Sequence, residues 1–240
     1  MMSSRFKPLA FAALAYLIDV FVLIYTFNFF LYTPQAARLR DSHYSAFFFI
    51  YVMIFVLRDV LAIGMVAWFC GACGMREREC VPLGRLSWKY VLWGVLGVFL
   101  FRVFAPPVMT WIMEEGVTHR FPTTRVAMFE PIRSLGISMG IAACLDNVLG
   151  PIYEEILYRG FLQTVFKKYM NGPLAVVTMS ALFALSHWPV FGMSWWEFTQ
   201  QFLMGLLFGV LREKSGMGPP IIAHQAKNFF VDLIAVHVIK

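Results

Sequence analysis

Charged side chains are rare in this sequence, yet one apolar segment carries three of them. The segment PIYEEILYRG, residues 151–160, contains Glu154, Glu155 and Arg159. On a helix, Glu155 and Arg159 lie four residues apart with the acid on the N-terminal side, which favours an ion pair. Glu154 points about 100° away from Glu155. The spacing therefore predicts one neutralised glutamate and one glutamate without a partner.

A glutamate without a partner in apolar surroundings has a chemistry of its own. Desolvation disfavours the charged form, so such a carboxylate takes up a proton from water more readily than an exposed one. We therefore interpret Glu154 as a candidate general base. A structural alternative stays open, in which both acids share Arg159 and hold helices together. The pair Glu114–Glu115 lies in a polar loop, where we expect both side chains to be solvated.

Two histidines lie in later apolar segments, each at helical spacing from a second notable residue. In SALFALSHWPV, Phe183 and His187 are four residues apart. In PPIIAHQAKNFFVD, His224 and Asn228 have the same spacing and share a helix face. A single histidine of this kind is more often a hydrogen-bonded core residue than a catalytic one. Three segments that each bring a proton-handling or hydrogen-bonding group point instead to a joint site.

Taken in order, the three motifs resemble those of the CPBP family of intramembrane proteases. That family, also called the Abi family, includes CAAX proteases and bacteriocin-processing enzymes, and it combines EExxxR, FxxxH and HxxxN or HxxxD on three helices. This sequence reads EEILYR at 154–159, FALSH at 183–187 and HQAKN at 224–228. The resemblance covers residues ~134–235, whereas the first half of the chain matches only as generic membrane helices.

The resemblance implies a glutamic intramembrane endopeptidase and gives four residues a catalytic role. Glu154 would be the general base that activates water, and His224 would help to position it. His187 and Asn228 would donate hydrogen bonds to the oxyanion that forms on the scissile carbonyl, which has most value in a water-poor site. The implied substrate is a membrane-associated protein or peptide precursor.

Three further residues would support this site, and two other function classes stay open. Glu155 would be held by Arg159, and Phe183 would pack against the site without doing chemistry. A catalytically inactive membrane interaction or immunity protein could keep the same motifs for helix packing. A transporter could use intramembrane acids and histidines as a proton relay. The lack of inverted repeats and the position of the motifs in the C-terminal half argue against a transporter.

No cofactor is expected, although a metal is the main mechanistic alternative. Glu154, His187 and His224 could form a three-ligand set with an open water position, giving a zinc-dependent version of the same protease. The HExxH arrangement of zinc proteases is absent. The sequence CGAC at 70–73 has CxxC spacing, but there is no second CxxC, so we expect ordinary thiols at all four cysteines, which are Cys70, Cys73, Cys80 and Cys144.

The elements that must position these residues are membrane helices. Hydrophobic residues make up 60% of the 240 residues and charged residues only 14%, which is far from the composition of a soluble domain. Apolar runs long enough to cross about 30 Å of hydrocarbon recur along the chain. The sequence predicts an all-α, polytopic transmembrane bundle of seven to eight helices with a type II CAAX prenyl endopeptidase-like core. The expected helices cover approximately residues 8–31, 45–70, 88–113, 134–150, 151–168, 173–190, 197–213 and 219–239.

We expect a single integral membrane domain over residues 1–240, with N-terminal helices in 1–125 and the catalytic core helices in 134–240. The first apolar run is too long for a signal peptide and predicts a retained span. A continuous helix through Gly150 and Pro151 would be about 50 Å long, so a break or kink is expected there. Pro151 would then lie in the first turn of the helix that carries the glutamates.

Other ionisable groups inside the predicted spans are expected to neutralise one another between neighbouring helices, because isolated charges are costly there. Asp19 in the first span and Arg58-Asp59 in the second are the main candidates, and Arg102 and Asp146 are expected to do likewise.

The net charge of +6 comes largely from basic loop residues. Their distribution favours a cytoplasmic N-terminus, and they suit contact with anionic lipid headgroups. The expected partners are thus the substrate and the lipid bilayer, with no nucleic acid. The compact size and short loops indicate a multi-pass protein of a prokaryotic inner (cell) membrane.

Overall fold

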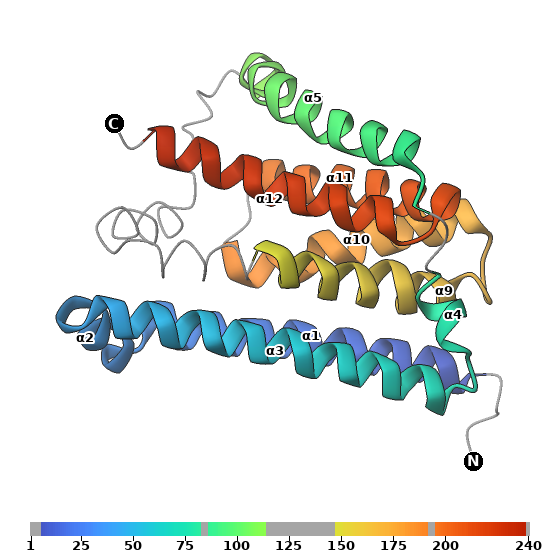
Figure 1. The fold of residues 1–240 in the computed structure, drawn as a ribbon, viewed down its shortest axis with the longest axis horizontal. Coiled ribbons are helices and arrows are strands. Elements are labelled where there is room, and N and C mark those ends of the chain that lie inside the picture. Colours follow the sequence, from blue (N-terminus) through green and yellow to red (C-terminus); the bar gives the residue numbers. More distant parts are fainter. Residues whose placement is uncertain (1–5, 83–85, 114–146, 192–194, 239–240) are drawn as a thin grey trace.

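The computed structural model describes residues 6–82, 86–113, 147–191 and 195–238 (Figure 1). Every regular element in these ranges is helical. The elements are α1 (Lys7–Tyr32), α2 (Pro34–Ser42), α3 (Tyr44–Ala72), α4 (Glu77–Cys80), α5 (Trp88–Met113), η1 (Ile156–Leu162), α9 (Gln163–Phe166), α10 (Gly172–Phe191), α11 (Trp195–Ser215) and α12 (Gly218–Val238).

The long helices α1, α3, α5, α10, α11 and α12 begin and end within two residues of the predicted apolar segments. The predicted segment 134–150 lies mostly outside the described residues. The short helix α2 occupies a segment that the sequence suggested was a loop. Its N-cap is Thr33, whose hydroxyl accepts a hydrogen bond from Ala36 N at 3.3 Å, and Pro34 follows in the first turn.

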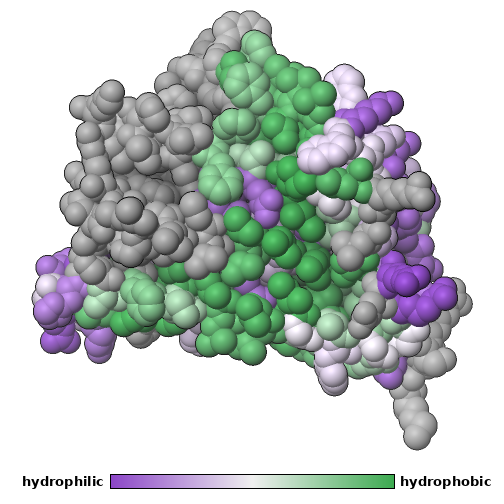
Figure 2. Space-filling view, viewed as in Figure 1, coloured by the Kyte–Doolittle hydropathy of each residue, from purple (hydrophilic) through white to green (hydrophobic). Residues whose placement is uncertain are grey.

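The outer surface is strongly apolar. Two helical segments within the described ranges are long and apolar enough to cross a membrane, Lys7–Thr26 and Phe49–Ala72, and two shorter apolar segments are Trp88–Phe101 and Gly172–His187. Apolar side chains cover much of the face in Figure 2. Exposed apolar surface of this extent suits contact with lipid. The predicted number of seven to eight crossing helices stays a prediction.

The helix with the glutamates lies between two packed groups of helices (Figure 1). On one side, α1 and α3 pack against η1 and α10 through a core that includes Ala15, Phe69 and Phe161. On the other side, α11 packs against α10, α12 and α5. Gly205 of α11 permits a close approach to α10, because a Cβ atom there would lie 3.0 Å from the Ser180 backbone.

The expected break at Gly150–Pro151 is not found in the described residues. Residues 147–155 are helical without interruption and continue directly into η1 and α9. Pro151 lacks the N–H that would bond the carbonyl of Asn147, and the helix continues past it without that hydrogen bond. The irregularity lies further on, in η1, which is a π-helix of seven residues.

The buried charges of the first two long helices do not pair as expected. Arg58 forms its ion pair with Asp59, its neighbour on α3, at 2.6 Å. Asp19 of α1 instead accepts hydrogen bonds from the hydroxyls of Tyr153 and Tyr158, the latter at 2.7 Å. The direct ion pair is thus within α3, while the charge of Arg58 also acts on Asp19 from the neighbouring helix. The expected partners Arg102 and Asp146 lie outside the described side chains.

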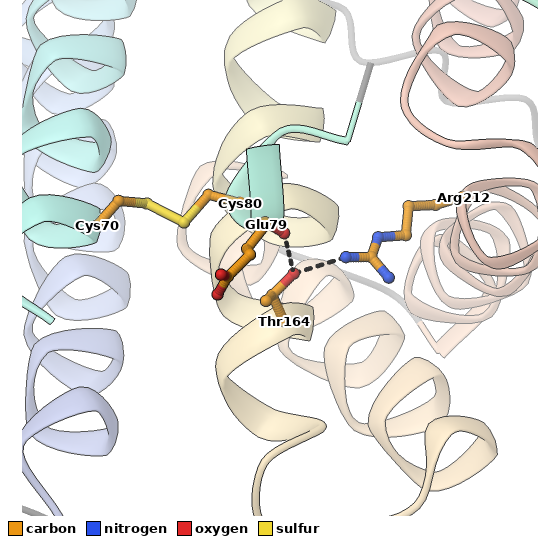
Figure 3. The surroundings of a disulfide bond; sticks show 5 residues. All are labelled: Cys70, Glu79, Cys80, Thr164 and Arg212. Carbon is orange, nitrogen blue, oxygen red and sulfur yellow. Dashed lines mark hydrogen bonds between the residues drawn. A yellow bond between two sulfur atoms is a disulfide. The ribbon is translucent and has the colours of Figure 1, made fainter. Parts of the chain in front are cut away.

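The expectation of free thiols is wrong for two cysteines. Cys70 near the end of α3 and Cys80 at the end of α4 form a disulfide (Figure 3). A turn at Gly74, with φ of +65°, sends the chain back toward α3 and buries Cys80. Cys73 is free, and Cys144 lies outside the described residues. The pairing joins residues ten apart through a turn, which the CxxC spacing did not indicate.

Candidate active site

Glu155 is the buried member of the glutamate pair. Its side chain is 0% exposed, and its Oε1 atom lies 3.1 Å from Nη1 of Arg159, at the four-residue spacing that predicted an ion pair. The two groups meet at ion-pair distance but without hydrogen-bond alignment. The same Oε1 atom accepts a hydrogen bond of 2.9 Å from Nδ1 of His224. Glu155 therefore links the first motif to the third.

Glu154 is the more accessible glutamate, with a side chain that is 24% exposed. Its Oε2 atom lies 3.6 Å from Nε2 of His224, which is too far for a direct hydrogen bond. The His224 ring thus lies between the two glutamates, with one ring nitrogen toward each. Glu154 also interacts electrostatically with His187. A water molecule that hydrogen-bonds Glu154 would consequently face two imidazole rings.

The hydrogen bonds of His187 define its tautomer. Its Nδ1 atom lies 2.8 Å from the carbonyl oxygen of Phe183 and 3.3 Å from the hydroxyl of Ser186. A carbonyl oxygen can only accept, so Nδ1 carries the hydrogen. In the neutral ring Nε2 is then an acceptor, and it becomes a donor only when the ring is protonated.

Phe183 and Arg159 form the floor of the site. The ring of Phe183 is fully buried and lies 4.7 Å from the His187 ring and 5.9 Å from the His224 ring, both edge to face. The Arg159 guanidinium lies 4.3 Å from the centre of the Phe183 ring. Phe208 of α11 stacks on the His224 ring at 4.8 Å. These apolar contacts hold the charged groups in fixed orientations.

The predicted residue Asn228 lies on α12, one helical turn after His224, and is partly exposed. The structure gives it no hydrogen bond with another described residue. The six other predicted residues, which are Glu154, Glu155, Arg159, Phe183, His187 and His224, are joined by the contacts above.

Sequence reasoning missed Lys227. This lysine lies on α12 between His224 and Asn228, is only 5% exposed, and donates a hydrogen bond of 3.0 Å to Gln201 of α11. Its charge acts on both Glu154 and Glu155. Glu154 therefore has a cation in its surroundings that the three motifs did not indicate. A lysine in the middle of an apolar segment was the available signal.

The donor groups do not gather as a metal site. The described residues contain no group of three His, Cys, Asp or Glu side chains that could hold a metal ion. Nδ1 of His187 is engaged by the Phe183 carbonyl and Nδ1 of His224 by Glu155, so Nε2 is the nitrogen of each ring that is left as a possible ligand. The alternative ligand set of Glu154, His187 and His224 stays a prediction.

Buried acidic and histidine side chains from three helices thus lie together inside an apolar outer surface, in an all-helical protein with two candidate membrane spans among the described residues. Residues 136–230 match the family described as Type II CAAX prenyl endopeptidase Rce1-like. The matched range contains the three motifs at 154–159, 183–187 and 224–228. The match agrees with the family resemblance that the three motifs indicated. No curated protein and no solved structure matches the chain.

Proposed function

We propose that the protein is an intramembrane endopeptidase that hydrolyses a peptide bond of a membrane-associated protein or peptide precursor. The observation that carries the proposal is the unequal environment of two adjacent glutamates. Glu155 is fully buried and held by Arg159 and His224, whereas Glu154 is partly exposed beside His224. Only Glu154 is accessible to a water molecule and a substrate carbonyl at once.

In the proposed reaction, Glu154 takes a proton from water as the water oxygen attacks the scissile carbonyl carbon. The negative charge that develops on the carbonyl oxygen is stabilised by hydrogen bonds from the Asn228 amide and from His187. His187 can donate only from Nε2 of a protonated ring, because Nδ1 is bound to Phe183 O. Glu154 then passes its proton to the leaving amine as the C–N bond breaks.

The reaction is proposed to need no metal. The support for this step is the sequence, which lacks the HExxH arrangement of zinc proteases. Activity should therefore persist after treatment with a strong chelator. We further propose that the enzyme is a multi-pass protein of a prokaryotic cell membrane.

The test compares wild type with Glu154→Gln in the native host background, with Glu79→Gln as a matched control in an exposed ion pair with Arg76. New peptide termini in membranes and medium are quantified by mass spectrometry. We expect a set of termini in wild type and Glu79→Gln that is absent in Glu154→Gln. Identical profiles, together with rescue of a deletion phenotype by Glu154→Gln, would replace the protease with a membrane interaction protein.

A further inference from the structure

The first long helix contacts the site helix through one carboxylate. Asp19 of α1 is buried, and its two oxygens accept hydrogen bonds from two different tyrosines, Oδ1 from Tyr153 and Oδ2 from Tyr158. Both tyrosines are buried as well. No motif pointed to Asp19, and it lies outside the range that matches the protease family.

The two tyrosines reach one carboxylate across the start of the π-helix, since Tyr153 lies in the α-helical turn before η1 and Tyr158 lies within η1. Residues five apart on an α-helix point about 140° away from each other. In the π-helix η1 the hydrogen bonds join residues five apart, which brings such residues toward the same side. The paired hydroxyls of Tyr153 and Tyr158 therefore match the π-helical form of this segment.

Each tyrosine directly precedes a residue of the site. Tyr153 is followed by Glu154, and Tyr158 is followed by Arg159, the partner of Glu155. A rotation of the helix that separated a hydroxyl from Asp19 would turn the next side chain by the same angle. The position of Asp19 thus determines the directions of the glutamates and of the arginine.

A second contact from the N-terminal half acts on the same segment. The carbonyl oxygen of Cys80 lies so close to Gly160 that a Cβ atom on this glycine would be 2.5 Å away. The Cys80 carbonyl at the end of α4 and the Asp19 carboxylate on α1 therefore both restrict the position of η1. The charge of Asp19 is offset by Arg58 of α3, which interacts with it electrostatically.

We propose that Asp19 is a positioning residue of the protease site, which holds the π-helical segment in the rotation that directs Glu154 toward the substrate. The proposal rests on the proposed function. It implies that the N-terminal helices are part of the catalytic apparatus as well as membrane anchors.

The experiment uses the full chain in lipid nanodiscs and three single variants. Asp19→Asn keeps the shape of the side chain but leaves only one acceptor oxygen for the two tyrosine hydroxyls. Tyr158→Phe removes one hydroxyl and keeps the ring. Tyr16→Phe is the matched control, because it removes a hydrogen bond from α1 to the carbonyl of Leu182 on α10 at 3.2 Å. The substrate probe is a membrane extract of the host that lacks the enzyme, and the initial rate of new termini is measured.

Two readouts separate positioning from a general structural role. Rates at several dilutions of the extract distinguish turnover from substrate capture. Hydrogen–deuterium exchange reports the backbone of residues 153–162, and the melting temperature reports global stability. We expect Asp19→Asn and Tyr158→Phe to lower turnover by about 10- to 100-fold, since small displacements of reacting groups have such effects. In these two variants, substrate capture and the melting temperature should stay near the wild-type values, and faster hydrogen–deuterium exchange should be confined to residues 153–162. The control Tyr16→Phe should behave as wild type in all readouts.

Unchanged turnover in both Asp19→Asn and Tyr158→Phe would overturn the proposal while leaving the protease in place. If Asp19→Asn does not fold, the Tyr158→Phe result decides alone. If wild type and Glu154→Gln are equally inactive, the proposed function fails. Hydrogen–deuterium exchange of residues 153–162 in Asp19→Asn then tests the positioning role by itself, and exchange as slow as in wild type would overturn that role too.

Discussion

Two neighbouring glutamates have different properties because they face different neighbours. Glu155 is enclosed by Arg159 and His224, so its charge is matched inside the protein. Glu154, one residue earlier, has a quarter of its side chain exposed. Pairs of acids in unequal environments are a common way to separate a reactive group from a supporting one. The buried Lys227 supplies a further cation close to this pair.

At the residue scale, stability and activity should separate between the two glutamates. Glu155→Gln leaves Arg159 as a buried charge without its carboxylate, which we expect to reduce the free energy of unfolding by about 3–5 kcal/mol. Glu154→Gln should abolish cleavage with little change in stability, because its side chain is partly exposed and makes no close ion pair. Denaturant unfolding in detergent micelles measures both variants. Equal losses of stability would show that both acids are structural.

At the element scale, the turn after α3 and the π-helix form one packed unit. The disulfide joins α3 to α4, the carbonyl of Glu79 accepts a hydrogen bond of 3.2 Å from Thr164, and Arg212 of α11 donates to the same hydroxyl at 2.6 Å (Figure 3). Next to these contacts, the Cys80 carbonyl lies against Gly160. Position 160 needs a glycine because its neighbour is the backbone of Cys80, which cannot shift away from an added Cβ atom as easily as the end of a flexible side chain.

Two glycine substitutions test this close approach. Gly160→Ala would place a methyl group 2.5 Å from the Cys80 oxygen, so we expect destabilisation by about 1–3 kcal/mol and loss of activity. Gly64→Ala on α3 is the control, since no atom lies within 4 Å of its Cβ position, and it should be neutral or stabilising by up to about 1 kcal/mol. Unfolding midpoints and cleavage rates are compared. A neutral Gly160→Ala would mean that α4 does not press on η1.

At the scale of the whole molecule, basic residues gather at one end of the bundle. Lys167 lies 2.5 Å from Glu213, and Arg212 lies 2.6 Å from the same carboxylate. Gln163 donates a further hydrogen bond of 2.8 Å to Glu213. The first residues of α1, α4 and α9 lie at this same end (Figure 1). The excess of positive charge predicts that this end faces the cytoplasm.

That orientation makes a prediction about the cysteines, because the cytoplasm keeps thiols reduced. The structure pairs Cys70 with Cys80, and at a cytoplasmic end the reductants of the cell should open this disulfide, so in growing cells it should form only after oxidant treatment. In a Cys144→Ser background, Cys73 should react with a membrane-impermeant maleimide only after permeabilisation. Burial raises the pKa of the Cys73 thiol, so its labelling should be slow at neutral pH and faster in mild alkali. If Cys73 is labelled in intact cells and the disulfide is already present, this end of the protein faces the outside of the cell and the predicted orientation is wrong.

The sequence by itself determined the long helices and the contacts within them. The apolar runs gave helix ends within two residues because a lipid-facing helix must be apolar over most of its length. The contact between Glu155 and Arg159 follows from a spacing of four residues on one helix. The polar helix α2 was not predicted from the apolar pattern, because its stability comes from its N-cap and its packing on α3.

Only the tertiary structure decided which groups meet across helices. His224 bridges the two glutamates, Lys227 turns inward to Gln201, Asp19 takes two tyrosine hydroxyls, and Cys80 reaches Cys70. Periodicity tells which face of a helix is shared, but it carries no information on the neighbour, the rotation or the depth at which two helices pack. The π-helical η1 is the clearest case, because its rotation depends on partners from α1 and α4 that are far away in the chain.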